Sequence, residues 1–172
     1  AGGFDVQYGD KLSSVLDITY KTPKTFKASL MASLLGAEAH VEQATGERFN
    51  YIIGARYRSN GYLLNALPTQ GSYNPVFTDA QISTNFKLTD KLTWSTLFHY
   101  SSNNYRFSPE TSETDFGTAN EAYSFKIYFD GQEQTKFETM MGGVSLKWKP
   151  NKKTNLDIYA TAFQTKEREY FD

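Results

Sequence analysis

The sequence predicts an all-β protein built as an antiparallel up-and-down meander. Apolar and polar residues alternate with a period of two along almost the whole chain, and helical periodicity is almost absent. Short and long connections between these segments also alternate, as they do at the two ends of a membrane β-barrel. Tyr and Phe account for 12 and 13 of the 172 residues, and aromatic residues concentrate at the rims of such barrels. We therefore expect part of a transmembrane β-barrel.

The composition is compatible with a membrane barrel and argues against several other classes. Mean hydropathy is -0.56, which is usual where only one face of each strand is apolar. No apolar run is long enough to predict a transmembrane helix. A formal net charge of -1 argues against nucleic-acid binding, and the absence of cysteine excludes disulfides and thiol catalysis. The chain starts at Ala1 without a signal peptide, so we expect the native N-terminus to precede it.

The first two strands are predicted on either side of Gly36. Apolar residues occupy the even positions from 26 to 32, and after Gly36 they occupy the odd positions from 37 to 41. A strand cannot exchange its faces without a bulge or a turn. A single strand over 24–44 would also be about twice as long as a tilted membrane strand needs to be. We therefore predict a tight turn near Gly36.

Further segments repeat the alternation and bring the predicted number of strands to about seven. They cover residues 51–58, 80–88, 92–100, 140–148 and 156–162. Bacterial single-chain barrels use an even number of strands, because an open edge in lipid leaves backbone groups unpaired. We therefore expect that this chain does not close a barrel alone and is part of a longer protein.

The connections predict which strand ends lie together. The short turns Thr45-Gly46-Glu47, Thr89-Asp90-Lys91 and Pro150-Asn151-Lys152-Lys153 would all be periplasmic if the first strand runs outward. The long segments 59–75 and 101–136 would then be extracellular. The second contains an alternating stretch that leads into Asp130-Gly131, a favoured two-residue hairpin turn. We predict an additional hairpin there, above the membrane.

Four aromatic residues near predicted strand ends indicate which environment the apolar face meets. We interpret Tyr57, Trp94, Tyr100 and Trp148 as membrane-rim aromatics. The alternative for the alternating pattern is an antiparallel soluble sandwich, whose strands also have one apolar face. A sandwich core would place these aromatics centrally, so we favour the membrane.

Groups that could perform chemistry are few. Glu38, His40 and Glu42 share one face of a strand with a spacing that can present three metal ligands, but we interpret them as polar residues of the barrel interior. His99 has no serine or carboxylate partner nearby in the sequence. The loop carboxylates between 110 and 115 lack the spacing of an EF-hand. We predict no catalytic residue, metal site or cofactor.

The N-terminal stretch Tyr8-Gly9-Asp10-Lys11-Leu12-Ser13-Ser14-Val15-Leu16-Asp17-Ile18-Thr19-Tyr20 is a glycine turn followed by a strand of small residues. It resembles the plug exit of TonB-dependent outer-membrane transporters, most closely the Bacteroidetes-type relatives of SusC, and the resemblance extends over nearly all of the chain. It implies that residues 1–22 are the end of a plug and that residues 23–172 are the first strands of a barrel of about 22. The plug-exit residues are Tyr8, Gly9, Asp10, Leu12, Ser13, Ser14, Val15, Leu16, Asp17 and Ile18.

The resemblance also implies active uptake across the bacterial outer membrane, with energy from TonB acting on a segment that would precede Ala1. Ligands in this family are bound by the plug and the extracellular loops. The implied ligand-facing residues are Asn60, Tyr62, Tyr73, Asn103, Asn104, Tyr105 and Arg106. Arg56, Arg58, Lys147 and Lys149 would point into the interior, where the plug packs. The apolar segment 63–68 would fold over the mouth or contact a SusD-like surface lipoprotein.

Other implied partners are outer-membrane lipid and the barrel-assembly machinery, which would meet an open sheet edge in a partly folded barrel. Two alternatives remain: a passive or structural outer-membrane barrel, and a barrel enzyme such as a lipase or protease. A plug encoded upstream separates the transporter from both. An enzyme also needs a nucleophile beside a base, and the sequence offers no convincing pair.

Overall fold

A computed structural model describes residues 17–66, 71–118, 121–129 and 131–171. These residues are almost entirely strand, which confirms the all-β prediction. The elements are β1 (Lys27–Ser33), β2 (Gly36–Thr45), β3 (Phe49–Ser59), α1 (Gly61–Leu64), β4 (Gly71–Thr89), β5 (Leu92–Pro109), β6 (Ser112–Thr118), β7 (Glu121–Ile127), β8 (Glu133–Asn151) and β9 (Thr154–Phe171).

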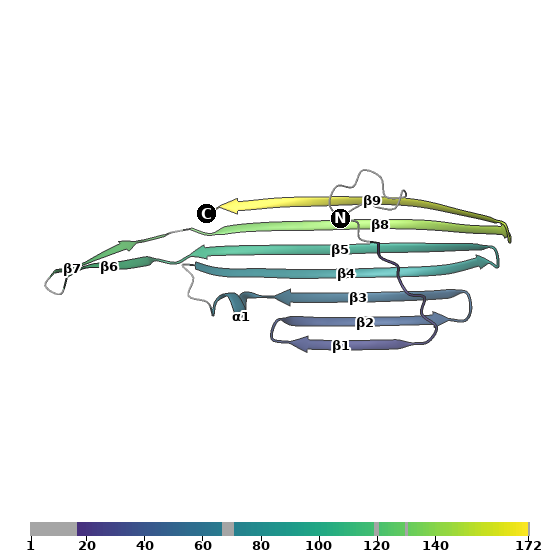
Figure 1. Cartoon of the computed structure of the whole chain (residues 1–172), viewed down its shortest axis with the longest axis horizontal. Coiled ribbons are helices and arrows are strands. Elements are labelled where there is room, and N and C mark those ends of the chain that lie inside the picture. Colours follow the sequence, from purple (N-terminus) through teal and green to yellow (C-terminus); the bar gives the residue numbers. More distant parts are fainter. Residues whose placement is uncertain (1–16, 67–70, 119–120, 130, 172) are drawn as a thin grey trace, which may run out of the picture.

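Seven strands form one antiparallel sheet in the order β1-β2-β3-β4-β5-β8-β9 (Figure 1). Strands β6 and β7 pair only with each other and form a separate hairpin between β5 and β8. Each strand of the sheet therefore lies beside its neighbours along the chain, which confirms the predicted meander and its seven strands.

The connections are sorted between the two ends of the sheet (Figure 1). The β2–β3, β4–β5 and β8–β9 turns lie together at one end, which we call the short-turn end. Helix α1 and the β6–β7 hairpin lie at the opposite end, which we call the long-loop end. The predicted grouping of the three short turns is confirmed.

Gly36 makes the first turn possible. Strand β1 ends at Ser33 and β2 begins at Gly36, whose φ of 147° lies in a region that L side chains avoid. A Cβ atom at this position would lie 2.1 Å from the carbonyl oxygen of Tyr57 on β3. Glycine is therefore required where β2 begins beside β3, and the turn predicted from the phase change is confirmed.

The register gives the sheet one apolar face and one polar face, because directly paired residues of antiparallel strands point to the same side. One row across five strands is entirely apolar: Phe49, Phe86, Trp94, Leu146 and Ile158. The adjacent row, which points the other way, consists of Asn50, Asn85, Ser95, Ser145 and Tyr159.

No second layer covers the apolar face within the described residues. The one buried hydrophobic side chain among them, Ile52, is 8 % exposed and belongs to the polar face. The accessible surface is 13416 Å², whereas a compact monomer of this mass would expose roughly 8,500 Å². The side chains that would form the core of a soluble domain are therefore bare.

Four strands are longer than the sequence indicated. Strands β4, β5, β8 and β9 have 18 or 19 residues, compared with 7 to 11 in β1 to β3. Much of the two segments expected as extracellular loops is therefore strand. The extension keeps backbone groups paired, and it brings the Tyr73 ring to 4.6 Å from that of Phe107 across the β4–β5 pair.

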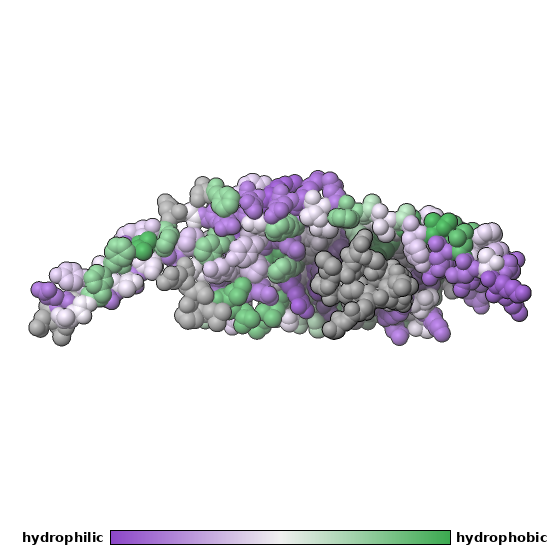
Figure 2. Space-filling view, turned by 45° about the horizontal axis from the view of Figure 1, so that its top comes forward, coloured by the Kyte–Doolittle hydropathy of each residue, from purple (hydrophilic) through white to green (hydrophobic). Residues whose placement is uncertain are grey.

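The additional hairpin exists, but the prediction of its turn at Asp130-Gly131 is wrong. The partner of β7 is β6, which precedes it, and Thr118 pairs with Glu121 across residues 119–120. Phe116 stacks on Tyr123, with ring centroids 5.9 Å apart. Strand β8 is paired with β5 and β9 instead, so the segment after Asp130, which itself lies outside the described residues, does not pair with β7. Figure 2 shows the hairpin as a narrow arm beyond the sheet that carries hydrophobic side chains.

Candidate functional site

The apolar face carries a continuous set of exposed hydrophobic side chains that we call the apolar band. Its exposed members include Ile53, Phe86, Trp94, Phe98, Met140, Val144, Trp148, Leu156 and Ile158. Their exposure ranges from 37 % for Val144 to 52 % for Met140 and Ile158. A contiguous apolar surface of this size indicates an interaction with lipid or with another protein.

The height of the apolar band matches the hydrocarbon layer of a membrane barrel. On β5 the apolar rows begin at that of Leu92, with Trp148 and Leu156, and the first polar row at the other end is that of Ser102, with Tyr57 and Glu138. Ten residues separate Leu92 from Ser102, which is about 34 Å along a strand and about 26 Å along the normal at the usual barrel tilt of about 40°. The apolar exterior of outer-membrane barrels is about 25 Å tall.

The four predicted rim aromatics lie at the two limits of the apolar band. Trp94 and Trp148 are in adjacent rows at the short-turn end. Tyr57 and Tyr100 are in adjacent rows at the long-loop end. All four point to the apolar face, and the row of Tyr57, which contains Thr78, Ser102 and Glu138, is the first polar row beyond that of Tyr100.

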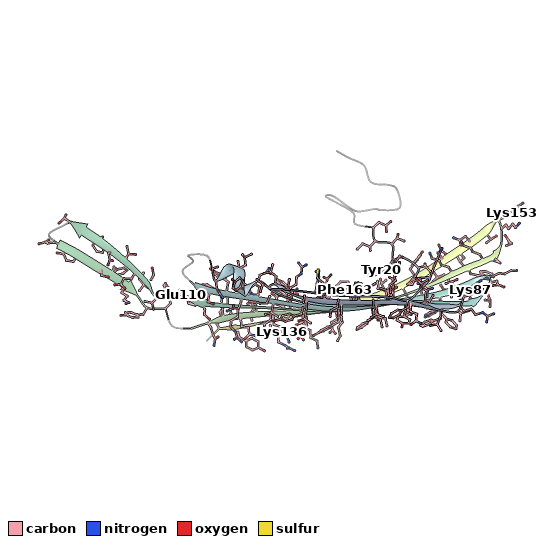
Figure 3. All side chains as sticks on the ribbon, turned by 90° about the horizontal axis from the view of Figure 1, so that it is seen from below. Tyr20, Lys87, Glu110, Lys136, Lys153 and Phe163 are labelled. Atoms are coloured by element: carbon pink, nitrogen blue, oxygen red, sulfur yellow. The ribbon has the colours of Figure 1, made fainter. Side chains whose placement is uncertain are left out.

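The N-terminal segment 17–26 crosses the polar face. Lys21 Nζ forms an ion pair with Glu42 Oε2, and the Tyr20 hydroxyl donates a 3.0 Å hydrogen bond to Gln81 Oε1. Pro23 is buried. Figure 3 shows Tyr20 and Lys136 on opposite sides of the sheet. The covered face is thus the polar one.

Of the predicted plug-exit motif, residues 8–16 lie outside the described residues. Asp17 and Ile18 are described, and both precede β1 in a stretch without regular secondary structure. The Ile18 side chain is 64 % exposed.

A shallow groove of about 330 Å³ runs over Gly54 on the polar face, between His40 and His99. His40 Nε2 lies 3.4 Å from Glu42 Oε2, so the two attract when the imidazole is protonated. In the described part of the chain, no three His, Cys, Asp or Glu side chains converge closely enough to hold a metal ion. Glu38, His40 and Glu42 therefore do not form a metal site here.

The four basic residues expected to face the interior all lie on the polar face of the sheet. Their neighbours differ from one residue to the next. Arg56 Nε donates a 2.8 Å hydrogen bond to Asp79 Oδ2 on β4, so its charge is matched within the sheet. Lys147 and Lys149 line a second groove at the short-turn end, of about 380 Å³, which Thr22 of the N-terminal segment also lines. Arg58 is exposed on β3.

The predicted ligand-facing residues do not share one surface. Asn60 and Tyr62 lie at α1, whereas the others belong to β4 and β5 rather than to loops. Alternate residues of β5 point to opposite faces of the sheet. Asn103 and Tyr105 therefore lie on the polar face, and Asn104 and Arg106 lie on the apolar side. The expectation that all seven lie in loops is therefore wrong for the five in β4 and β5, and strand alternation divides those five between the two faces of the sheet.

Three of these candidates lie with other aromatic residues on the polar face at the long-loop end. Tyr73 contacts both Tyr105 and Phe107, at centroid distances of 6.2 and 4.6 Å. Burial raises the pKa of Tyr105, and nearby Tyr73 and Glu133 add to the effect, so its hydroxyl stays protonated. Asn103 lies in the row of Phe77 and Phe137. The aromatic rings of this group can stack against a flat ligand, and the tyrosine hydroxyls and the Asn103 amide can donate hydrogen bonds to it.

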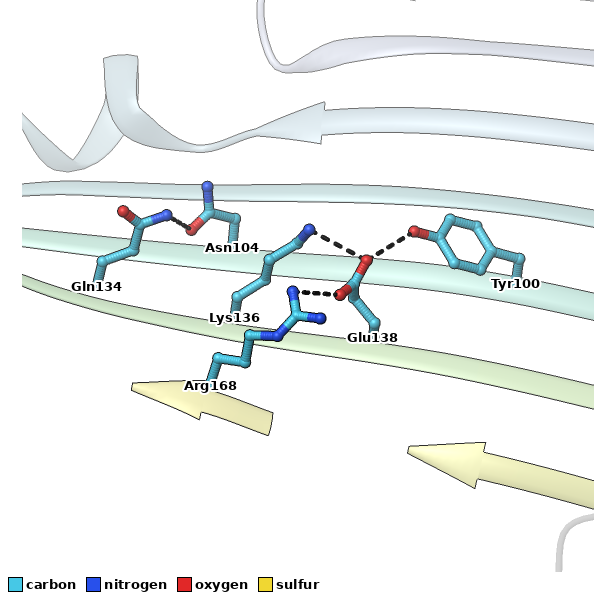
Figure 4. Close-up of polar contacts among 6 residues, drawn as sticks. All are labelled: Tyr100, Asn104, Gln134, Lys136, Glu138 and Arg168. Carbon is cyan, nitrogen blue, oxygen red and sulfur yellow. Dashed lines mark hydrogen bonds and ion pairs between the residues drawn. The ribbon is translucent and has the colours of Figure 1, made fainter. Parts of the chain in front are cut away.

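A polar network that the sequence did not predict lies just beyond the apolar band (Figure 4). Glu138 receives Lys136 Nζ, Arg168 Nη1 and the Tyr100 hydroxyl at 3.1, 3.1 and 3.2 Å. Gln134 Nε2 donates a 3.0 Å hydrogen bond to Asn104 Oδ1. The contributing residues come from three strands, so only the register brings them together.

No helix among the described residues is long and apolar enough to span a membrane. No protein-family model matches the chain, and neither a curated protein nor a solved structure matches it.

Proposed function

We propose that the chain is the plug exit and the first seven barrel strands of a TonB-dependent outer-membrane transporter. In this proposal residues 1–22 end the plug, and residues 23–172 begin a barrel of about 22 strands in the bacterial outer membrane. The transporter takes up a nutrient or other ligand, and TonB acts on a segment that precedes Ala1.

One observation carries the proposal. The N-terminal segment packs on the polar face through Lys21 and Tyr20, while the opposite face is apolar and bare. A barrel with a plug has this arrangement, because lipid covers the outside and the plug fills the lumen. A soluble sandwich has the reverse, with its apolar face covered.

The edges of the sheet support membership of a larger barrel. All 18 residues of β9 are exposed, and among the described strands only β8 pairs with it. A long, flat and unpaired edge is an aggregation hazard in water. We propose that the next strand of the barrel pairs with β9, and that the barrel-assembly machinery holds this edge during folding.

The ligand would meet the polar face at the long-loop end, where the barrel opens to the exterior. Tyr73, Asn103 and Tyr105 are the candidates from the sequence that face this way, and the register adds Phe107 to them. Helix α1, with Tyr62 and Leu63 exposed, is the proposed contact for a surface lipoprotein at the barrel mouth.

The second candidate function is a passive or structural outer-membrane barrel, which would have the same bare apolar band. The active transporter and the passive barrel are distinguished by measuring which compounds cells remove from a medium that supplies each compound at a limiting concentration. The comparison uses cells with the full-length gene, cells without it and cells without TonB, with mass spectrometry as the readout. The transporter predicts at least one compound whose depletion needs both the protein and TonB. Depletion that needs the protein but not TonB would support the passive barrel and contradict active transport.

A further inference from the structure

Three cations lie on the apolar side of the sheet just beyond the apolar band, at the long-loop end. Lys166 of β9 pairs in register with Glu138 of β8, and Arg168 pairs with Lys136 in the next row. We call Lys136, Lys166 and Arg168 the cationic belt. Figure 3 shows Lys136 on the side opposite to Tyr20, which is the side of the apolar band.

The belt has an excess of positive charge. Its one carboxylate, Glu138, is bound at one oxygen by Lys136 and at the other by Arg168, both at 3.1 Å (Figure 4). Lys166 is exposed and forms no ion pair among the described residues. One row further out, Arg106 donates to Gln134 Oε1 at 3.4 Å, again without a carboxylate. The surface therefore carries unneutralised cations beside neutral amides.

The depth of the belt fits the headgroup layer of a bilayer. Successive rows on one face are two residues apart, which is about 5 Å along the normal at the usual barrel tilt. Lys166 is one row beyond Tyr100 and Met140, and Lys136 and Arg168 are two rows beyond them. Headgroups extend about 5–8 Å from the hydrocarbon, and long basic side chains reach down toward them while their stems cover apolar surface.

We infer that the cationic belt binds the phosphate groups of anionic lipids in the leaflet at the long-loop end. The inference rests on the proposed function, because it needs the apolar band to face lipid. Lys and Arg bind phosphate through charge-assisted hydrogen bonds. Arg168 contacts Glu138 through Nη1, and the other N–H groups of its guanidinium can donate to a phosphate. The belt adjoins the apolar band, which favours a lipid as the ligand. The acyl chains of the same lipid molecule would lie against Met140 and Ala162 on the apolar face.

The test measures lipid binding to the full-length protein in neutral detergent by native mass spectrometry, with phosphatidylglycerol and phosphatidylcholine as probes. The variant is Lys136→Gln with Lys166→Gln, which leaves Arg168 to neutralise Glu138. We expect the wild type to prefer phosphatidylglycerol. We expect the variant to bind it about fivefold more weakly for each cation removed, with its affinity for phosphatidylcholine unchanged.

The matched control is Lys147→Gln with Lys149→Gln, which also removes two cations, both from the polar face of β8. Equal loss in both double variants, or an unchanged preference in the first, would overturn the inference. Displacement of phosphatidylglycerol by inorganic phosphate would also overturn it, because the site would then take the free ion. Carbonate extraction of membranes distinguishes the two proposals: a wild type that does not insert refutes the proposed function, whereas an inserted wild type without lipid preference refutes only the belt.

Discussion

Lys21 and Glu42 form an ion pair that ties the N-terminal segment to β2 on the polar face of the sheet. The Glu42 side chain is 3 % exposed and that of Lys21 is 60 % exposed. The most deeply covered charge of the described residues therefore lies on the face that an ordinary sheet protein leaves to water. The hydrophobic residues lie on the other face, without cover.

Replacing Lys21 with Met should weaken the attachment of the N-terminal segment. The Glu42 carboxylate would keep His40 beside it and Lys27 opposite it on β1 but would lose its ion-pair partner, so we expect the folded state to become less stable. The coupling between Lys21 and Glu42 is measured by a double-mutant cycle with Glu42→Gln. The free energy of unfolding of each full-length variant is determined by urea unfolding in vesicles. Additivity of the two substitutions within about 0.3 kcal/mol would contradict a direct interaction.

Gly36→Ala should disrupt the β1–β2 turn. The added Cβ would meet the Tyr57 carbonyl oxygen at 2.1 Å, and the backbone would also have to leave a φ of 147°, so we expect a loss of at least about 2 kcal/mol. Gly142→Ala is the control, because nothing lies within 4 Å of its added Cβ. There we expect no loss, or a gain of about 0.5–1 kcal/mol from a less flexible unfolded chain. Equal unfolding free energies for the two variants would refute this account of Gly36.

Alternation and turn residues were enough to predict the sheet, because both are local properties of the chain. The phase change at Gly36 placed the first turn, and the spacing of the short connections placed three strand ends together. The hairpin turn was misplaced because Asp130-Gly131 is a stronger turn signal than residues 119–120. What decided the pairing was the contact of Phe116 with Tyr123 and of Glu113 with Lys126, which depends on register.

The site was less predictable, since contacts across strands depend on the register of distant segments. The sequence placed Arg56 on the inner face but did not indicate its partner Asp79, which lies directly opposite it on β4, 23 residues away. Glu138 and Arg168 are 30 residues apart in sequence and meet only because β8 and β9 pair without a shift there. Trp94 and Trp148 could be placed near strand ends because the adjoining turn residues are local signals, whereas Tyr100 lies in the middle of β5 because that strand continues to Pro109.

A charge in the middle of the apolar band should be far more costly than a charge beside it on the other face. Phe98→Arg would place a guanidinium in the hydrocarbon layer, at a cost of about 2–4 kcal/mol, and should reduce the folded fraction in the outer membrane. His99→Arg changes the next residue, which faces the polar groove, and should be tolerated. Heat-modifiable electrophoretic mobility of the full-length protein reports folding. Similar losses for both variants would argue against a lipid-facing side.

The β6–β7 hairpin should lose stability in acid. Glu113 accepts a 2.7 Å hydrogen bond from the Ser124 hydroxyl and lies 3.1 Å from Lys126 Nζ. Both contacts lower the pKa of Glu113 below its ordinary value of 4.5. Since the folded state favours the carboxylate, this contribution is fully present above pH 4.5 and is lost as the pH falls through the lowered pKa.

Amide hydrogen exchange, corrected for intrinsic rates, measures this effect in the hairpin. Protection of β6 and β7 should fall on acidification in the wild type, and Glu113→Gln should show low protection at neutral pH with little further change. Glu110→Gln, which precedes β6, is the control and should behave like the wild type. An identical pH response of Glu113→Gln and the wild type would rule out this role of the carboxylate.

The most direct test of the central claim is a nitroxide scan along β5 of the full-length protein in lipid vesicles. Single cysteines are introduced at each position from 94 to 101, and the accessibility of each label to oxygen is measured. Oxygen concentrates in hydrocarbon, so we predict high values at the apolar-band positions 94, 96, 98 and 100, and low values at the polar-face positions between them. High accessibility at the positions that include His99, or no alternation at all, would contradict an outward apolar face.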